Sequence, residues 1–392
     1  MVRFLLAVGL SLAIAATATA APSGTRSFDG SGNNVAHPTW GAAGQPYRRI
    51  AAPAYADGRS AMASGPNARY LSNRIFNDAN QNLFSENGIS QWGWAWGQFI
   101  DHDMGLRDES SGGAANIGFD PGDPLESFDN ELGSIGFDRT PAAPGTGVTN
   151  PRQQVNTLSS FLDASQIYGT DGQRRQWLLA PDGASLLTSG GYLPRASAKP
   201  NAPVMDLFGA QQGRPGSAVV AGDVRANENM ALTALHTLFV REHNRIVAAL
   251  PRSLGAGQRY DIARRVVGAE VQYITYTQFL PTLGVRLGTY TGYHADVNPT
   301  LTNEFATVGF RAHSMVHGEF EPSFPEGTFS QARLDAFARQ GIEVEHEDGR
   351  VVLVISLSLA FGNPDLLQAV GLGPFLASLG EVQYKNDEQI DN

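Results

Sequence analysis

The segment GQFIDHDMG, residues 97–105, places one histidine between two aspartates. On a helix that turns by about 100° per residue, Gln98, Asp101 and His102 fall within one arc, whereas Asp103 points to the next face. One face therefore carries an amide, an acid and a base, which are residue types that orient ligands and transfer protons. Charged groups are rarely buried without a partner, so the Asp103 carboxylate requires a partner elsewhere in the chain.

A second segment, LSSFLDASQIYG, contains oxygen-bearing residues that could answer this carboxylate. In an extended loop, alternate residues share one side, which here carries Ser159, Phe161, Asp163 and Ser165. Two hydroxyls, one backbone carbonyl and one carboxylate, joined by Asp103, form a set of hard oxygen ligands that suits Ca²⁺. The alternative is ordinary turn chemistry, in which the Ser and Asp side chains bond to their own backbone.

Two further segments add basic groups. GDVRANENM contains Arg225 and Glu228, which are three residues apart and would share a face of a helix. A surface ion pair is the alternative for these two residues. GFRAHSMVHGEFE contains His313 and His317, which are four residues apart and suit a metal pair on a helix. Two histidines without an intervening acid are weak evidence for such a site.

The elements that must position these side chains are mainly helical. The residue patterns predict helices over residues 86–105, 225–250, 262–279 and 303–317. Asp261 is expected to cap the third of these helices, and Asn363, followed by Pro364, to cap another. The sequence IEVEHEDGRVVLVIS predicts a hairpin with Asp348-Gly349 as its turn. With 44 Gly and 22 Pro, the predicted class is mainly α with long loops and little β-sheet.

The composition limits the function classes that remain. The chain has 392 residues, of which 42% are hydrophobic, so a large core is possible. A net charge of -10 and the lack of a basic block argue against a nucleic-acid partner. The absence of cysteine excludes thiolate metal ligands, thiol nucleophiles and iron–sulfur clusters. Nothing in the sequence defines an oligomeric state.

The first 20 residues have the pattern of a secretory signal peptide. Arg3 precedes an apolar run over residues 4–16, and Ala18-Thr19-Ala20 forms a small-residue cleavage site. An uncleaved anchor is the alternative, but the run is short for a spanning helix. No later segment is long and apolar enough to span a membrane. We therefore expect a secreted or periplasmic protein without stable membrane insertion. Residues 21–66 are predicted to form an irregular N-terminal arm.

Taken together, these segments resemble the animal-type haem peroxidases, the superfamily that also contains the cyclooxygenases. WGQFIDHDM, SSFLDASQIYG, GDVRANEN, LHTLFVREHNR and QYITYTQFLP stand in the order and at the spacing of that family, and the resemblance runs from about residue 26 to the end. It implies a haem peroxidase-like helical domain at residues 67–392, in a secreted bacterial protein. It also implies a haem-dependent peroxidase that reduces hydrogen peroxide and oxidises halide, thiocyanate or phenolic donors.

The resemblance assigns roles to individual residues. Three would be catalytic: His102 as the distal histidine, Gln98 as the distal amide over the iron, and Arg225 as the catalytic arginine. Three would bind haem b: His313 as the proximal iron ligand, with Asp101 and Glu228 as acids that can form esters to haem methyl groups. Five would bind Ca²⁺: Asp103, Ser159, the Phe161 carbonyl, Asp163 and Ser165.

The proximal segment departs from the family pattern. The proximal histidine of the family usually follows Arg-x-Gly, whereas here Ala312 precedes His313 and Arg311 lies one place closer. His317 competes as the iron ligand, but FRAHS matches the family better.

Two other departures affect the expected activity. Asn229 stands where some mammalian members carry a methionine that forms a third bond to haem, so chloride oxidation is not expected. The chain stops at YKNDEQIDN, whereas family members continue with an asparagine that hydrogen-bonds the proximal histidine and an Arg-Asp-His-Gly-like segment. We therefore expect a fragment of a longer protein in which the C-terminal part of the catalytic domain is missing, and the intact mass of the native protein tests this.

Two alternative functions follow from the same resemblance. A fatty-acid dioxygenase of the superfamily would carry a radical-forming tyrosine just before the proximal histidine, and residues 308–312 contain none. A non-catalytic adhesion or matrix module would have no need of His102, Arg225 or the pair of haem-linking acids. Both alternatives are therefore less consistent with the sequence than a peroxidase.

Overall fold

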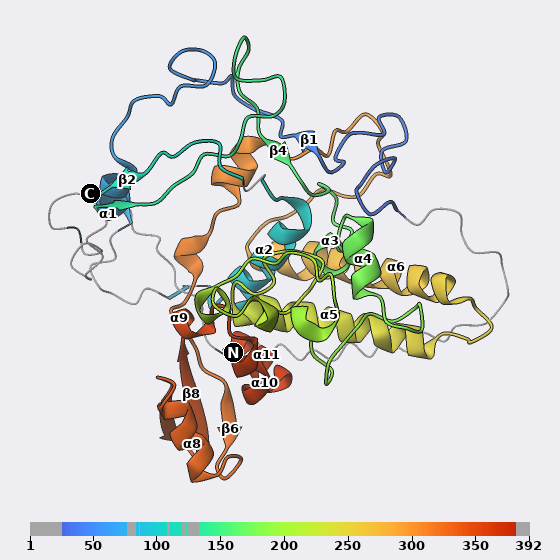
Figure 1. Cartoon of the computed structure of the whole chain (residues 1–392), viewed down its shortest axis with the longest axis vertical. Coiled ribbons are helices and arrows are strands. Elements are labelled where there is room, and N and C mark those ends of the chain that lie inside the picture. The colour runs from blue at the N-terminus through green and yellow to red at the C-terminus, as the bar shows by residue number, and fades with distance from the viewer. Residues whose placement is uncertain are drawn as a thin grey trace.

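The computed structural model describes residues 26–381, apart from residues 77–83, 86, 108–109, 120–122 and 124–132. The predicted signal peptide and the last residues of the chain lie outside this part. Helices dominate and the strands form only small sheets (Figure 1), so the predicted fold class is confirmed. None of the described helices is long and apolar enough to span a bilayer.

The helices and strands are short apart from three central helices. The helices are α1 Ala68–Ile75, α2 Trp92–Met104, α3 Ser165–Tyr168, α4 Gly172–Leu178, α5 Met230–Ala249, α6 Ala256–Ile274, α7 Leu280–Thr282, α8 Gln331–Ala338, α9 Leu357–Ala360, α10 Pro364–Val370 and α11 Leu372–Glu381. The strands are β1 Gln45–Pro46, β2 Ile117–Gly118, β3 Ser134–Ile135, β4 Val155–Asn156, β5 Glu319–Phe320, β6 Ser323–Pro325, β7 Glu343–Glu347 and β8 Arg350–Ser356.

The core is built on α2, α5 and α6. The long helices α5 and α6 lie side by side, and α2 packs against α5 (Figure 1). Phe99 of α2 stacks on Phe239 of α5 with ring centroids 5.4 Å apart, in the first of two hydrophobic clusters. Trp94 and Met230, from the same two helices, are buried in the second cluster. The helix that carries His102 is therefore held in place by packing in both clusters.

The predicted hairpin is confirmed in the C-terminal sheet. β7 pairs antiparallel with β8, and Asp348 and Gly349 form the turn with φ values of 47° and 73°. Both values lie in the left-handed region that such a two-residue turn requires. β8 also pairs with β5 and β6, and its buried side chains join the second cluster.

Three predicted helix boundaries are wrong, and their causes are local. The first helix begins at Trp92 rather than near residue 86. The Asn229 side chain accepts the N–H of Leu232 and starts α5 at Met230, five residues after the predicted start. Asp261 does not cap α6, which begins at Ala256.

The predicted helix over residues 303–317 does not form. The chain makes a π-helical turn at Phe305–Gly309 and a single 3₁₀ turn at His313–Met315. No described side chain of this segment is fully buried. Most helix stability comes from packing an apolar face, so a segment without one does not hold a long helix. The Asn363 cap before α10, by contrast, is confirmed.

Candidate active site

The helix α2 presents the four predicted residues as the sequence pattern requires. His102 is 3% exposed and Asp103 is fully buried, whereas Gln98 and Asp101 are partly exposed. Asn229 donates from its side-chain amide to Gln98 Oε1 at 2.9 Å, which ties α2 to the start of α5.

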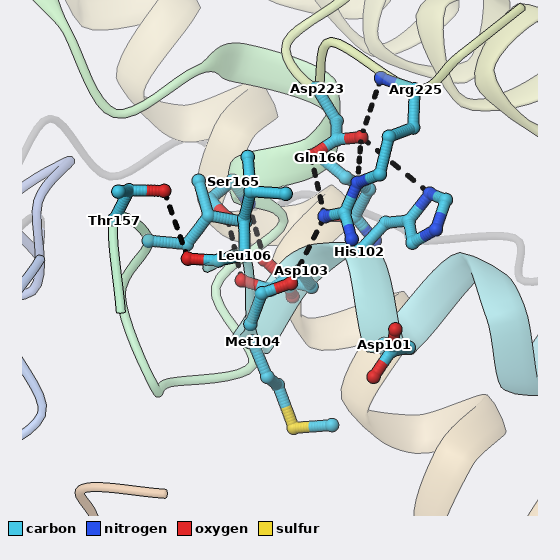
Figure 2. A network of polar contacts seen from close by, with 12 residues as sticks. Asp101, His102, Asp103, Met104, Leu106, Thr157, Ser165, Gln166, Asp223 and Arg225 are labelled. Atoms are coloured by element: carbon cyan, nitrogen blue, oxygen red, sulfur yellow. Dashed lines mark hydrogen bonds and ion pairs between the residues drawn. The ribbon is translucent and has the colours of Figure 1, made fainter. Parts of the chain in front are cut away.

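Asp223 links His102 to Arg225. The Arg225 guanidinium donates to both Asp223 carboxylate oxygens, from Nε at 2.9 Å and from Nη2 at 2.8 Å. Arg225 Nη2 also donates to the carbonyl of Gly105 at the end of α2, at 3.1 Å. Asp223 Oδ1 lies 3.5 Å from His102 Nδ1, which is too long for a hydrogen bond. Figure 2 shows dashed contacts from the Asp223 carboxylate to both of the other side chains, and Asp101 apart from them.

Burial and the paired charges set the protonation of this group. Burial, together with the nearby Arg225 charge, lowers the pKa of His102 well below its usual value, so the imidazole is neutral. Burial alone would raise the pKa of Asp223, but the Arg225 charge and the hydrogen bonds that Arg225 donates outweigh it and hold that pKa below the ordinary value. Asp223 therefore remains an anion beside a neutral histidine.

The loop before α5 places Arg225 and Glu228 differently from the prediction. Both precede the first residue of α5, so they do not share a helix face. Glu228 Oε2 lies 3.9 Å from His102 Nε2, on the opposite side of the imidazole from Asp223. Burial raises the pKa of Glu228, and its side chain is 28% exposed.

Asp101 faces a cleft rather than the Asp223 network. The cleft has a volume of about 450 Å³, within the usual range of ligand pockets. Asp101, Arg225 and Arg311 all line it, and Arg311 Nη1 lies 3.5 Å from Asp101 Oδ2. Burial raises the pKa of Asp101. Neither His102 nor His313 lines this cleft.

The two candidate proximal histidines are not on one helix face. His313 lies on the 3₁₀ turn that contacts α2, and it is exposed. Its imidazole makes no hydrogen bond or ion pair with the described part of the chain, and its charge affects the pKa of Asp101. His317 accepts the backbone N–H of Glu319. His313 is therefore the less engaged imidazole of the two.

Four of the five predicted calcium ligands, Asp103, Ser159, Asp163 and Ser165, are connected by contacts, although not along one extended loop. Ser165 is the first residue of α3, so the alternation expected from residue 159 onward ends there. Asp103 accepts the backbone N–H groups of Ala164 at 3.0 Å and Ser165 at 2.6 Å, and Ser165 Oγ donates to the Asp103 carbonyl. Ser159 Oγ donates to Asp163 Oδ2 at 3.4 Å. The hydrogen bond from the Phe161 N–H to Ser159 Oγ, at 3.1 Å, is the local turn chemistry of the alternative interpretation, whereas the Asp103 contacts join α2 to the loop.

Two buried carboxylates, Asp103 of α2 and Asp163 of the loop, nevertheless lie near enough for their charges to interact. Burial raises the pKa of Asp103 to about 6, and burial together with the Asp103 charge raises the pKa of Asp163 well above its usual value. Asp163 Oδ1 is buried without a hydrogen-bond partner. No cluster of three or more His, Cys, Asp or Glu side chains suited to a metal occurs in the described residues. A cation here would therefore rely on hydroxyl and carbonyl oxygens as well as on the two carboxylates.

The residues present fit both a haem group and a calcium ion. Asp101 of α2 lines a cleft, His102 of the same helix is buried and neutral, and His313, with an unengaged imidazole, lies on a turn that contacts α2. The unpartnered Asp163 Oδ1 is the corresponding observation for calcium. One residue of the site, Asp223, is missing from the sequence prediction. The sequence feature that could have indicated Asp223 is its position two residues before Arg225. An acid in a loop can equally cap a helix or face solvent, so this position alone does not predict an ion pair.

Comparison with known proteins supports one family. Human thyroid peroxidase is 35% identical over 410 residues, covering 90% of this chain and 42% of that protein. Peroxidasin from Drosophila melanogaster is 33% identical over 340 residues, covering 74% of this chain and 22% of the relative. The chain thus spans less than half the length of these curated relatives.

Solved structures agree in fold. Peroxidase A from Dictyostelium discoideum matches with a TM-score of 0.73 at 24% identity, covering 93% of this chain and 69% of that one. A fatty acid alpha-dioxygenase from Arabidopsis thaliana matches with a TM-score of 0.66 at 18% identity, covering 93% and 57%. These likenesses show the fold alone. The family model for animal haem peroxidase matches residues 25–390, and the chain therefore belongs to the animal haem peroxidase family.

Proposed function

We propose that this protein is a haem peroxidase that reduces hydrogen peroxide and oxidises small donors. The observation that carries the proposal is the buried group in which Asp223 joins neutral His102 to Arg225. When bound, haem supplies the iron and the redox capacity for cleavage of the O–O bond. The chain must supply the proton transfer, the charge stabilisation and the groups that hold the cofactor.

His102 is suited to proton transfer at Nε2. The Asp223 carboxylate lies on the Nδ1 side of the ring and favours the tautomer with a proton on Nδ1. Nε2 is then free to accept a proton from one oxygen of hydrogen peroxide and return it to the leaving oxygen. Arg225, held by Asp223, would stabilise the negative charge that develops on that oxygen. Gln98 would orient the small molecules that share this space.

Three residues are proposed to hold haem b. His313 would ligate the iron, and Asp101 and Glu228 would form ester links to haem methyl groups. Asp101 is supported by its place in the cleft, and His313 by its unengaged imidazole beside α2. Mass analysis of the denatured protein tests the ester links. Ester-linked haem remains on the chain and adds to its mass, whereas haem without a covalent link is released.

The test of the peroxidase proposal is the visible spectrum before and after one equivalent of hydrogen peroxide. A haem band that shifts promptly and recovers with bromide, iodide, thiocyanate or a phenol supports it. His102→Ala should retain the band but lose most of the response, whereas the exposed control His294→Ala should behave as the native protein. Oxygen uptake with an unsaturated fatty acid in the absence of peroxide would instead favour a dioxygenase. A protein without haem from haem-replete cells would favour the non-catalytic module.

We also propose that calcium joins α2 to the loop at residues 159–165. The support is the interacting pair of buried carboxylates at Asp103 and Asp163, whose repulsion a divalent cation would relieve. Asp163→Ala should lose bound calcium and lower the melting temperature, while the surface variant Asp348→Ala should retain calcium. If calcium content and melting temperature were both unchanged in Asp163→Ala, the turn chemistry alone would account for the loop.

Export is proposed from the first 20 residues. N-terminal sequencing of the protein recovered from the medium or the periplasm should begin at residue 21 or 22. A native N-terminus at Met1 would contradict cleavage.

A further inference from the structure

The cleft beside Asp101 is unusually rich in arginine for a chain with a net charge of -10. Asp101 is its one acidic lining residue among those described. Six arginines line it, and we call it the arginine cleft: Arg49, Arg107, Arg139, Arg152, Arg225 and Arg311. The overall charge repels anions at long range, so any attraction for an anion must come from this local cluster.

Two of these arginines are already neutralised by acids of the candidate active site. Arg225 pairs with Asp223 at 2.8 Å, and Arg311 lies 3.5 Å from Asp101. Their contacts place them at the part of the cleft that adjoins α2. Arg225 and Arg311 are therefore assigned to the candidate active site and not to the binding of a further ligand.

Three others make no ion pair with a carboxylate of the described residues. Arg49 donates to the Gln153 and Gln154 side-chain oxygens and to the Arg152 carbonyl. Arg152 is buried and donates to Ser60 Oγ and to the carbonyls of Gly112 and Thr140, while its Nε has no partner. Neutral oxygens fix these guanidiniums in place. The Arg49 charge also acts on the Glu304 carboxylate, whereas Arg152 makes no ion pair with a described acid.

Arg139 is the guanidinium with the most freedom to bind. Arg139 is half-buried and lines the cleft, and its guanidinium makes no hydrogen bond or ion pair with the described chain. Its charge lies close enough to Arg152 to lower the pKa of that residue, after the larger effect of burial. Two like charges that approach each other without an acid destabilise the site until an anion joins them.

The wall next to Arg139 is apolar. Phe137, two residues away, is 49% exposed, and Met62 is 56% exposed, yet both line the cleft. The Tyr55 hydroxyl, which accepts from Arg49, adds a polar group on the same lining. An apolar wall with a cationic group beside it fits a flat ligand that carries one negative group.

We propose that the arginine cleft binds the carboxylate of an aromatic donor through Arg139 and Arg152, so that phenolic acids are preferred to neutral phenols. This inference rests on the proposed peroxidase function for the oxidation of the donor, but not for its binding. A carboxylate could also come from the side chains of the cofactor itself, and the experiment separates these two sources.

The experiment compares matched ligands on the holoenzyme and uses Arg139→Gln. The control is Arg252→Gln, an exposed arginine outside the cleft. Calorimetry measures binding of benzoate and of benzyl alcohol without peroxide. Steady-state kinetics measures the oxidation of 4-hydroxybenzoate and of 4-hydroxybenzyl alcohol. Haem content is measured for every variant.

Loss of one charge-assisted contact predicts roughly tenfold weaker benzoate binding and a similar rise in KM for 4-hydroxybenzoate, with kcat unchanged. The neutral ligands and the control variant should change less than about twofold, because surface changes have small effects. Higher salt should weaken benzoate binding in the native protein.

Three results would overturn the donor site: unchanged benzoate binding in Arg139→Gln, equal losses for the acid and the neutral phenol, or loss of haem from the variant. The last would assign the arginine to the cofactor. If benzoate binding falls as expected but neither phenol is oxidised by the native holoenzyme, the anion site stands and the proposed peroxidase function fails.

Discussion

At the scale of single residues, Asp223 is the group on which the others depend. It is buried, it pairs with Arg225, and it lies beside the Nδ1 side of His102. A buried carboxylate is stable only because a guanidinium answers it, and the same pairing keeps the arginine in place. One residue thus orients both groups that the proposed chemistry requires.

We predict that Asp223→Asn slows the reaction with hydrogen peroxide by roughly 10- to 100-fold while haem is retained, because the amide no longer anchors Arg225 or favours the His102 tautomer. Loss of one partner of a buried ion pair should also cost about 3–5 kcal/mol of unfolding free energy. Stopped-flow absorbance and thermal unfolding measure the two effects. Asp171→Asn, at a carboxylate with 58% side-chain exposure, is the control. An unchanged peroxide rate in Asp223→Asn would remove Asp223 from the mechanism.

At the scale of elements, the loop before α5 is positioned by a close backbone approach. A Cβ atom on Gly222 would lie 2.5 Å from the Gly169 nitrogen and 2.5 Å from the Ile167 carbonyl carbon. The Asp223 N–H donates to the Gln166 carbonyl at 2.9 Å in the same contact. The loop can therefore reach the end of α3 only because residue 222 has no side chain.

Gly222→Ala should destabilise the fold by about 1–3 kcal/mol, since backbone atoms must move to accept the methyl group. It should also weaken the peroxide response by displacing Asp223. The control is Gly257→Ala in α6, where an added Cβ meets nothing within 4 Å and alanine is the better helix former. Thermal melts of both variants test this pair, and an equal or higher melting temperature in Gly222→Ala would contradict the close backbone approach at this position.

A second prediction at this scale concerns the contact between α5 and α6. Burial, and then the Glu242 carboxylate of α5, raise the pKa of Glu270 in α6 to about 7. The pKa of Glu270 is higher in the folded protein than in the unfolded chain. The contact between Glu270 and Glu242 therefore lowers the free energy of unfolding as pH rises from about 4.5 to 7. Glu270→Gln should therefore stabilise the protein above pH 7, by about 1 kcal/mol after allowance for solvent screening. Melting temperatures at pH 4 and pH 8 test it, and a gain only at the lower pH would contradict the sign.

At the scale of the whole molecule, the N-terminal arm is held onto the helical core. The Phe28 ring lies between two guanidiniums, with Arg175 at 3.4 Å and Arg264 at 3.7 Å from its centroid. Arg264 also donates to the carbonyls of Arg26 and Ser27. Farther along the arm, the Gly41 carbonyl accepts the Ser160 N–H in the proposed calcium loop. The arm therefore supports the loop that in turn contacts α2.

Phe28→Ala should lower the unfolding free energy by about 2–3 kcal/mol, because it removes a packed ring and two cation–π contacts. The arm should then become accessible to limited proteolysis before the core does. Val35→Ala, at a side chain that is 75% exposed, should leave both properties unchanged. An arm of normal protease resistance in Phe28→Ala would show that other contacts hold it.

Local patterns in the sequence were sufficient for the helical class, the β7–β8 hairpin, the Asn363 cap and the presence of Gln98, Asp101 and His102 on one helix. Each depends on interactions within a few residues, such as helical periodicity, a cap or a turn. The family resemblance added the roles of individual residues, which remain proposals. The spacing of residues alone does not assign such roles.

Contacts between distant segments settled the rest. The place of Asp223 beside His102 and the arginine cleft both bring together residues far apart in the chain, and the helix predicted over residues 303–317 fails because no described side chain there is fully buried. Burial and the approach of charges depend on which segments pack together, and no local pattern encodes this packing. The sequence thus gives the chemical type of each side chain, whereas the fold determines the partner of that side chain and its protonation state.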